Sequence, residues 1–238
     1  MEIVKALAKL FKIEKNVNLA YQKIRPHSSF SPWNIDLEFL NTMEQIQQHT
    51  LVDKLRCYEL WQLVEQSSKL EKGCLIEIGV WRGGTGALIA KKAKSCGINN
   101  KIYLCDTFTG VVKASQKDPS YFNGEHADTS KKLVEDLVFN KLDLKNVQLL
   151  QGIFPDDTGK EVENESFRFC HIDVDVYQSA KDIVEWIWPK MISGGIIVFD
   201  DYGFESCKGI ATYVHELQKY KGNIVLHNLN GHAVVIKI

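Results

Sequence analysis

The stretch Cys74-Leu75-Ile76-Glu77-Ile78-Gly79-Val80-Trp81-Arg82-Gly83-Gly84-Thr85-Gly86 decides the fold of this chain. It begins with a short apolar run that is typical of a buried strand. The glycines that follow permit a tight turn with close backbone approach, and a helix-like segment continues over residues 85–94. A strand, a glycine-rich turn and a helix in this order predict a ligand-binding α/β unit.

Further apolar runs follow along the chain, and helix-like segments such as 179–188 separate most of them. They occupy residues 101–106, 147–152, 167–173 and 196–200. Strands alternating with helices predict a doubly wound, mostly parallel sheet covered on both faces. The end differs, because the apolar runs 224–229 and 233–238 flank Asn230-Gly231, which is a strong signal for an antiparallel hairpin. Together the runs predict seven strands.

The N-terminal region has helical periodicity, at 37–46 and 52–64, but no convincing strand. We therefore expect residues 1–72 to form a helical appendage or lid on a domain spanning 73–238. Lysines interrupt the amphipathic start, residues 1–16, which does not resemble a signal peptide. No run approaches the length of a transmembrane helix, so we expect a cytoplasmic protein.

Composition excludes several classes of protein. The 238 residues include 29 Lys+Arg and 30 Asp+Glu, a net charge of −1. This balance disfavours nucleic-acid or membrane binding through bulk positive charge. The 10 % aromatic content excludes wholesale disorder. Six cysteines are present without a C-x-x-C pair, which favours buried free thiols in a reducing compartment.

The spacing of the glycine turn narrows the choice of ligand. Gly79 and Gly84 have P-loop spacing, but Thr85 stands where a P-loop requires lysine. Trp81 occupies the position of the second glycine of a dinucleotide fingerprint and would obstruct a pyrophosphate. The remaining acidic-x-Gly-x-x-x-Gly pattern is typical of S-adenosylmethionine (SAM) sites. Glu77 suits the cationic groups of SAM, and backbone N–H groups with Arg82 suit its carboxylate.

Acidic residues end three of the predicted strands. Asp106 can accept hydrogen bonds from both ribose hydroxyls of an adenosine group, although ribose recognition alone does not separate NAD from SAM. The pair Asp173 and Asp175 and the pair Asp200-Asp201 end two later strands. Four converging carboxylates would repel one another without a cation or shared protons, and oxygen ligands suit Mg²⁺, Mn²⁺ or Ca²⁺.

Two histidines lie close to these motifs. We expect His171 to be a structural, inward-facing strand residue. His126 is a weaker candidate for substrate contact, because it lies in the polar segment 113–129. We interpret that segment as a long loop at the carboxyl edge of the sheet, where open α/β sheets bind ligands, and as a lid that orders when ligands bind.

Five motifs together resemble the TylF/MycF (macrocin O-methyltransferase) family, and they cover about residues 56–209. They are EIGVWRGG at 77–84, DTFTG at 106–110, GIFPDDT at 152–158, IDVDVY at 172–177 and GGIIVFDDY at 194–202. The resemblance implies a class I, Rossmann-like methyltransferase that uses SAM and a divalent metal to methylate a hydroxyl, often on a sugar of a natural product. It implies a metal on Asp173, Asp200 and Asp201, with Asp175 as the base.

From these motifs we expect a set of cofactor-binding residues, with the adenine near 152–154: Glu77, Gly79, Arg82, Gly83, Gly84, Thr85, Asp106, Phe108, Gly152 and Phe154. We expect SAM, Mg²⁺ or a similar divalent cation and a small-molecule hydroxyl acceptor as ligands, with no nucleic acid and no membrane. The sequence is compatible with a homo-oligomer and with a monomer. Neither the segment 113–129 nor the first fifty residues match a family pattern, so the acceptor is left open.

Two alternatives come from other functional classes. A nicotinamide-dependent oxidoreductase would use the Tyr-x-x-x-Lys spacing of Tyr177 and Lys181, but the glycine spacing disfavours it. A catalytically silent SAM-binding assembly subunit would not explain the repulsion within the acidic cluster.

Overall fold

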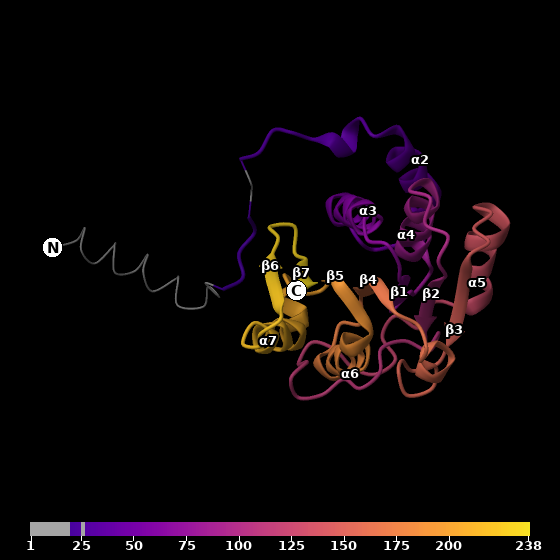
Figure 1. The fold of residues 1–238 in the computed structure, drawn as a ribbon. Coiled ribbons are helices and arrows are strands. Elements are labelled where there is room, and N and C mark those ends of the chain that lie inside the picture. Colours follow the sequence, from indigo (N-terminus) through magenta and orange to yellow (C-terminus); the bar gives the residue numbers. More distant parts are fainter. Residues whose placement is uncertain (1–19, 25–26) are drawn as a thin grey trace.

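The computed structural model describes residues 20–24 and 27–238. The amphipathic stretch 1–16, and with it the start of the expected appendage, lies outside the described residues. In the described part, seven strands form one sheet in the order β3-β2-β1-β4-β5-β7-β6 (Figure 1). The strands are β1 (Cys74–Ile78), β2 (Ile102–Asp106), β3 (Val147–Gln151), β4 (Phe167–Ile172), β5 (Met191–Phe199), β6 (Asn223–His227) and β7 (Ala233–Lys237).

The strand directions confirm the predicted mostly parallel sheet with a terminal hairpin. Strands β1 to β5 pair in parallel, whereas β7 runs antiparallel to both β5 and β6. The hairpin returns through a turn at residues 228–231, with the N–H of Gly231 donating to the carbonyl of Asn228. The chain order reverses between β1 and β4, so the carboxyl ends of these two strands flank the crevice where such sheets bind ligands.

Helices cover both faces of the sheet. They are α2 (Leu37–Ile46), α3 (Lys54–Ser67), α4 (Gly84–Ser95), α5 (Lys131–Glu135), α6 (Tyr177–Ile187) and α7 (Lys208–Leu217), with short helical turns at Pro32–Asn34, Asp136–Lys141, Gly159–Val162, Trp188–Lys190 and Glu205–Cys207. Figure 1 shows α2, α3 and α4 on one face, and α6 and α7 on the other.

Alternating strand side chains supply one hydrophobic core for each face, as the period-2 geometry of a strand requires. Leu75 and Leu104 join the core under α2, α3 and α4. Ile76 and Cys105, one residue further along each strand, join the core under α6 and α7. The apolar runs read as continuous in sequence because both faces of the sheet are buried.

The N-terminal helices pack directly on the sheet domain. Phe39 and Trp61 belong to the same buried cluster as Leu75 of β1. Asp36 caps α2 by accepting the N–H of Phe39 at 3.0 Å and also accepts the Trp61 indole N–H at 3.1 Å, which ties α2 to α3. Both helices therefore contribute to the core that supports β1.

The segment between β2 and α5, residues 107–130, contains no helix or strand, as predicted for 113–129. Buried contacts hold it in place. Asp118 is 1 % exposed and accepts the backbone N–H of Tyr177 at 2.8 Å. Lys113 forms ion pairs with Asp156 at 2.7 Å and Asp182 at 2.6 Å. These contacts anchor the loop to α6 in the absence of ligand.

Candidate functional site

The glycine turn after β1 brings the backbone against the end of β4. Gly79 adopts a φ of 87°, and a Cβ there would overlap the carbonyl oxygen of Asp173. Gly83, with a φ of 88°, precedes α4 as its N-cap. A left-handed conformation combined with this close approach explains why glycine is required at position 79.

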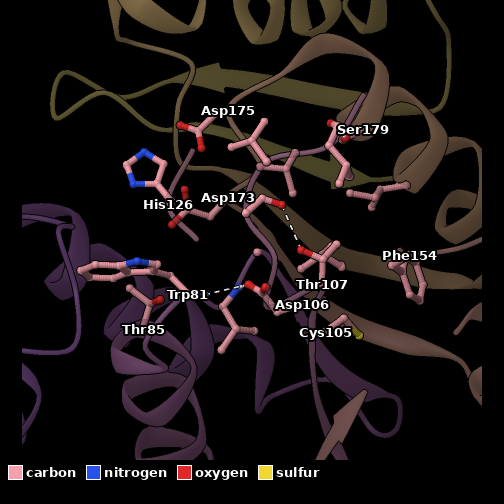
Figure 2. Close-up of a pocket in the computed structure, with 18 of the residues that line it drawn as sticks. Trp81, Thr85, Cys105, Asp106, Thr107, His126, Phe154, Asp173, Asp175 and Ser179 are labelled. Carbon is pink, nitrogen blue, oxygen red and sulfur yellow. Dashed lines mark hydrogen bonds between the residues drawn. The ribbon is translucent and has the colours of Figure 1, made fainter. Parts of the chain in front are cut away.

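Asp106 at the end of β2 holds the turn from the opposite side. Its Oδ2 accepts the N–H groups of Val80 at 2.7 Å and Trp81 at 2.8 Å, and Figure 2 shows Asp106 next to Trp81. Its Oδ1 accepts the N–H of Phe108 at 2.6 Å. Burial raises the pKa of Asp106, and the three N–H groups oppose that rise. The carboxylate therefore shapes the turn itself, a role that the sequence analysis did not assign to it.

A cavity opens between this turn, the end of β4 and the 107–130 loop (Figure 2). Of the predicted cofactor residues, Gly79, Thr85, Asp106, Gly152 and Phe154 line it. Glu77, Arg82, Gly83, Gly84 and Phe108 are not among its lining residues. Half of the predicted cofactor residues therefore line the cavity and half do not.

Glu77 and Arg82 have other partners. The Glu77 side chain is wholly buried, and its Oε1 is hydrogen-bonded to His171 Nδ1 at 2.8 Å. Arg82 forms an ion pair with Asp128 at 2.6 Å and stacks on the Trp81 ring at 4.5 Å. Both predicted cofactor-binding side chains thus have partners within the protein, and neither is among the cavity-lining residues. His171 is fully buried in β4, as predicted.

The predicted metal ligands do converge. Asp173, Asp200 and Asp201 each offer one carboxylate oxygen, and these oxygens lie within 4.8 Å of one another. Strand β5 ends at Phe199, and Asp200 and Asp201 lie in a bend, so the two adjacent side chains can face the same site. Burial, together with the charges of the neighbouring carboxylates, raises the pKa of Asp173 and of Asp201 well above the ordinary value.

Asp200 differs from its neighbours because the protein itself surrounds it with cationic and hydrogen-bonding groups. Arg56 forms an ion pair with its Oδ2, and His232 Nε2 lies 2.9 Å from its Oδ1. Burial favours the neutral acid, but His171, His232 and Arg56 outweigh it and lower the pKa of Asp200. At Asp173 and Asp201, by contrast, burial and the neighbouring carboxylates make the charged forms unfavourable without a cation.

Asp175 lies on the cavity wall beside this cluster and faces His126 (Figure 2). Its φ of 64° is left-handed, so the backbone is not extended at Asp175. Its backbone N–H donates to Asp201 Oδ2 at 2.9 Å. Burial raises the pKa of the Asp175 carboxyl, against a hydrogen bond from Tyr121 and the nearby charge of His126, which lower it.

Several cavity residues were not singled out from the sequence. They are His49, Thr50, Leu51, Val52, Val80, Trp81, Cys105, Thr107, Val111, Val112, Ser179 and Ile183. Residues 49–52 precede α3 and reach the cavity because Gly84 donates its N–H to the carbonyl of His49 at 2.9 Å. No local motif marks this contact, since it joins segments that are distant in the chain. His126, a weak candidate, does line the cavity.

The spacing Tyr177-x-x-x-Lys181 does not build a hydride-transfer site. The Tyr177 hydroxyl donates to Glu216 at 2.7 Å, and Lys181 lies 3.7 Å from Glu185. Neither residue lines the cavity. In the described part of the chain, no helix is long and apolar enough to cross a membrane, and the six cysteines are free thiols.

Comparison with known proteins gives a consistent family. The chain is 26 % identical over 170 residues to 8-demethyl-8-(2,3-dimethoxy-alpha-L-rhamnosyl)-tetracenomycin-C 4'-O-methyltransferase of Streptomyces olivaceus, covering 67 % of this chain and 65 % of that protein. It is 26 % identical over 187 residues to mycinamicin III 3''-O-methyltransferase of Micromonospora griseorubida, covering 73 % and 72 %. The chain thus spans about two thirds of the length of the first of these relatives.

The fold is also shared with solved structures. The O-methyltransferase NovP superimposes with a TM-score of 0.69 at 22 % identity, over 79 % of this chain and 82 % of that one. The model of the macrocin-O-methyltransferase (TylF) family matches residues 38–234, a range that contains the glycine turn, the acidic cluster and both N-terminal helices. The chain belongs to the macrocin-O-methyltransferase (TylF) family.

Proposed function

We propose that this protein transfers the methyl group of SAM to a hydroxyl of a small molecule, a sugar or another natural-product intermediate, with the help of a divalent cation. The observation that carries the proposal is the cavity that joins the Gly79 turn to Asp173 and Asp175. Family membership supports O-methylation. The named acceptors of two relatives, a rhamnosyl tetracenomycin and a mycinamicin, support a glycosylated acceptor.

In this proposal SAM lies along the cavity wall formed by the ends of β1 and β2. The remaining lone pair of the Asp106 carboxylate, on Oδ1, would accept a ribose hydroxyl, while the other three keep the turn in shape. Gly152 and Phe154 would flank the adenine. Thr85, in the first turn of α4, places the amino end of that helix at the cavity, which suits the carboxylate of the methionine moiety.

The acidic cluster has the donor set of a hard divalent cation such as Mg²⁺. Three carboxylate oxygens converge from Asp173, Asp200 and Asp201, and hard cations take oxygen ligands. The raised pKa values of Asp173 and Asp201 mean that their charged forms need compensation, which a divalent cation would supply. When bound, the cation would polarise an acceptor hydroxyl and hold it in a fixed orientation.

Asp175 has the position and the environment of a general base. It lies in the cavity next to the cluster, and burial raises its pKa, so its affinity for a proton is greater than that of a solvated aspartate. As the acceptor oxygen attacks the methyl carbon, the carbon–sulfur bond breaks and its electron pair stays on sulfur. The hydroxyl proton passes to Asp175, and S-adenosylhomocysteine (SAH) and the methyl ether are the products.

The proposal is tested with a panel of glycosylated and free-sugar acceptors incubated with SAM and Mg²⁺. Mass spectrometry should show a gain of one CH₂ in at least one acceptor, with stoichiometric SAH. Titration with NAD(P)H serves as the control for the oxidoreductase alternative. Binding of NAD(P)H without binding of SAM would overturn the proposal. Binding of SAM without turnover on any acceptor class would favour the silent assembly subunit.

A further inference from the structure

A buried chain of polar contacts connects helix α3 to the acidic cluster. It begins at Glu59, whose carboxylate is hydrogen-bonded to three side chains of the segment that joins β6 to β7. These are the amide of Asn228, the amide of Asn230 at 2.7 Å and the Nδ1 of His232 at 2.7 Å. Figure 1 shows the β6–β7 turn on the same side of the sheet as α3.

His232 carries the chain of contacts inward to Asp200. Its ring is 0 % exposed, its Nδ1 is held by Glu59, and its Nε2 lies 2.9 Å from Asp200 Oδ1. The other oxygen of Asp200 is paired with Arg56, which lies one turn before Glu59 on α3. The Arg56 guanidinium is itself fixed by Asp53 at 2.8 Å and by the face of Phe204 at 4.5 Å.

We propose that Glu59 and His232 are positioning residues that fix the orientation of the Asp200 carboxylate in the cluster. The proposal rests on the proposed role of Asp200 as a metal ligand. It assigns to α3, whose Glu59 lies far before the cluster in sequence, a part in building the metal site rather than only a part in covering the sheet. Neither residue lines the cavity, so neither is proposed to touch SAM or acceptor.

The local backbone of Asp200 explains why such support is needed. Strand β5 ends at Phe199, and Asp200 and Asp201 lie in a bend. The backbone N–H of Asp200 still donates to the carbonyl of Ile172 at 3.0 Å, but this bond does not set the orientation of the Asp200 side chain. Asp200 is only 2 % exposed, and water cannot satisfy its oxygens from outside. Arg56 on α3 and His232 just before β7 therefore select the orientation of the Asp200 carboxylate. Removal of partners that hold a metal ligand in this way changes metal affinity by about 10–100-fold.

The test measures Mn²⁺ affinity by electron paramagnetic resonance, with no acceptor present. Glu59→Ala and His232→Asn should each weaken Mn²⁺ binding by about 10-fold or more. Because Glu59 is proposed to act through His232, the double variant should bind Mn²⁺ no more weakly than His232→Asn alone, which is a non-additive cycle. Glu65→Ala on the same helix is the matched control, since Glu65 pairs with Lys92 on the surface and should leave Mn²⁺ affinity unchanged.

Asparagine and glutamine substitutions at position 232 distinguish two roles of His232: orienting Asp200, or only holding the β6–β7 hairpin against α3. The asparagine amide mimics Nδ1 and can still reach Glu59, whereas the glutamine amide mimics Nε2 and can still reach Asp200. Positioning predicts that His232→Gln recovers more Mn²⁺ affinity than His232→Asn. If His232 only holds the hairpin against α3, His232→Asn should recover the melting temperature and both variants should bind Mn²⁺ with equal affinity. That result would overturn the proposal.

The outcomes distinguish this proposal from the proposed function. If the wild type binds no Mn²⁺, the metal assignment fails and the positioning role fails with it. If the wild type binds Mn²⁺ and Glu59→Ala binds it equally well, only the positioning role is overturned. Should Glu59→Ala fail to fold, Glu59→Gln keeps one acceptor oxygen for the hairpin, and unchanged Mn²⁺ affinity in that variant and in His232→Asn would equally refute the proposal.

Discussion

Replacing Asp106 with asparagine tests whether one carboxylate both shapes the glycine turn and binds the cofactor ribose. In the wild type the three N–H donors lie at 2.6–2.8 Å from the carboxylate oxygens, distances typical of charge-assisted hydrogen bonds. The asparagine carbonyl can keep the two bonds from Val80 and Trp81. Its amide group would then face the N–H of Phe108, so one bond is replaced by two opposed donors.

The expected loss of stability follows from the one hydrogen bond that the substitution removes. Loss of one hydrogen bond to a charged group costs about 1.5–3 kcal/mol, and the N–H of Phe108 loses its acceptor in a largely buried site, since that residue is 9 % exposed. We expect the free energy of unfolding to fall by about 2 kcal/mol. We expect SAH affinity to fall by about 10–100-fold, because the oxygen left free for the ribose, Oδ1, is replaced by an amide group that cannot accept the hydroxyl proton.

Urea denaturation and isothermal titration calorimetry with SAH measure the two effects separately. Asp156→Asn is a suitable control, since Asp156 pairs with Lys113 away from the turn. A folded Asp106→Asn protein with wild-type SAH affinity would refute the ribose assignment. A wild-type free energy of unfolding would refute the role of Asp106 in holding the turn.

Three further predictions concern the turn, the base and the buried histidine. Gly79→Ala should prevent SAH binding and lower the melting temperature, because its Cβ would overlap the Asp173 carbonyl; calorimetry showing normal SAH binding would contradict this close approach. Asp175→Asn should lower the turnover number by about 10²–10⁴ while leaving Mn²⁺ affinity nearly unchanged, and a defect confined to metal affinity would make Asp175 a ligand. Burial opposes protonation of His171, but Asp200 and Glu77 outweigh it and raise the pKa to about 9. In metal-free protein the resulting contribution to the free energy of unfolding should be complete below about pH 6.5 and be lost as the pH rises through about 9. A His171→Asn variant with the same loss of stability would show that His171 is not its origin.

The sequence allowed the fold and the acidic edge to be predicted because both depend on local patterns. Buried strands give continuous apolar runs, and Asp173, Asp200 and Asp201 follow directly from strand ends that a parallel sheet brings together. Strand β5 begins at Met191, earlier than the predicted start at Ile196. Gly194 and Gly195, which precede the predicted run, lie inside the strand, where the pairing with β4 shifts register.

The missing parts of the site depend on contacts between distant segments. Glu77 looked available for SAM because it stands next to the glycine turn, but His171 on the adjacent strand takes its carboxylate. Arg82 is taken by Asp128, a residue of the long loop. Nothing local in the sequence signals that His232 at the C-terminal hairpin and Arg56 on α3 would meet at Asp200, since side-chain partners of this kind are set only by tertiary packing.

A crystal structure of the protein with SAH and Mn²⁺, with an anomalous difference map at the manganese edge, tests the central claim most directly. The claim is that one cavity places SAM beside a divalent cation held by Asp173, Asp200 and Asp201. We predict SAH along the Gly79 turn, with a ribose hydroxyl bonded to Asp106 Oδ1, and an anomalous peak among the three carboxylates, next to Asp175 but not bound to it. SAH at another site, or a cluster without a manganese peak at saturating Mn²⁺, would contradict the account.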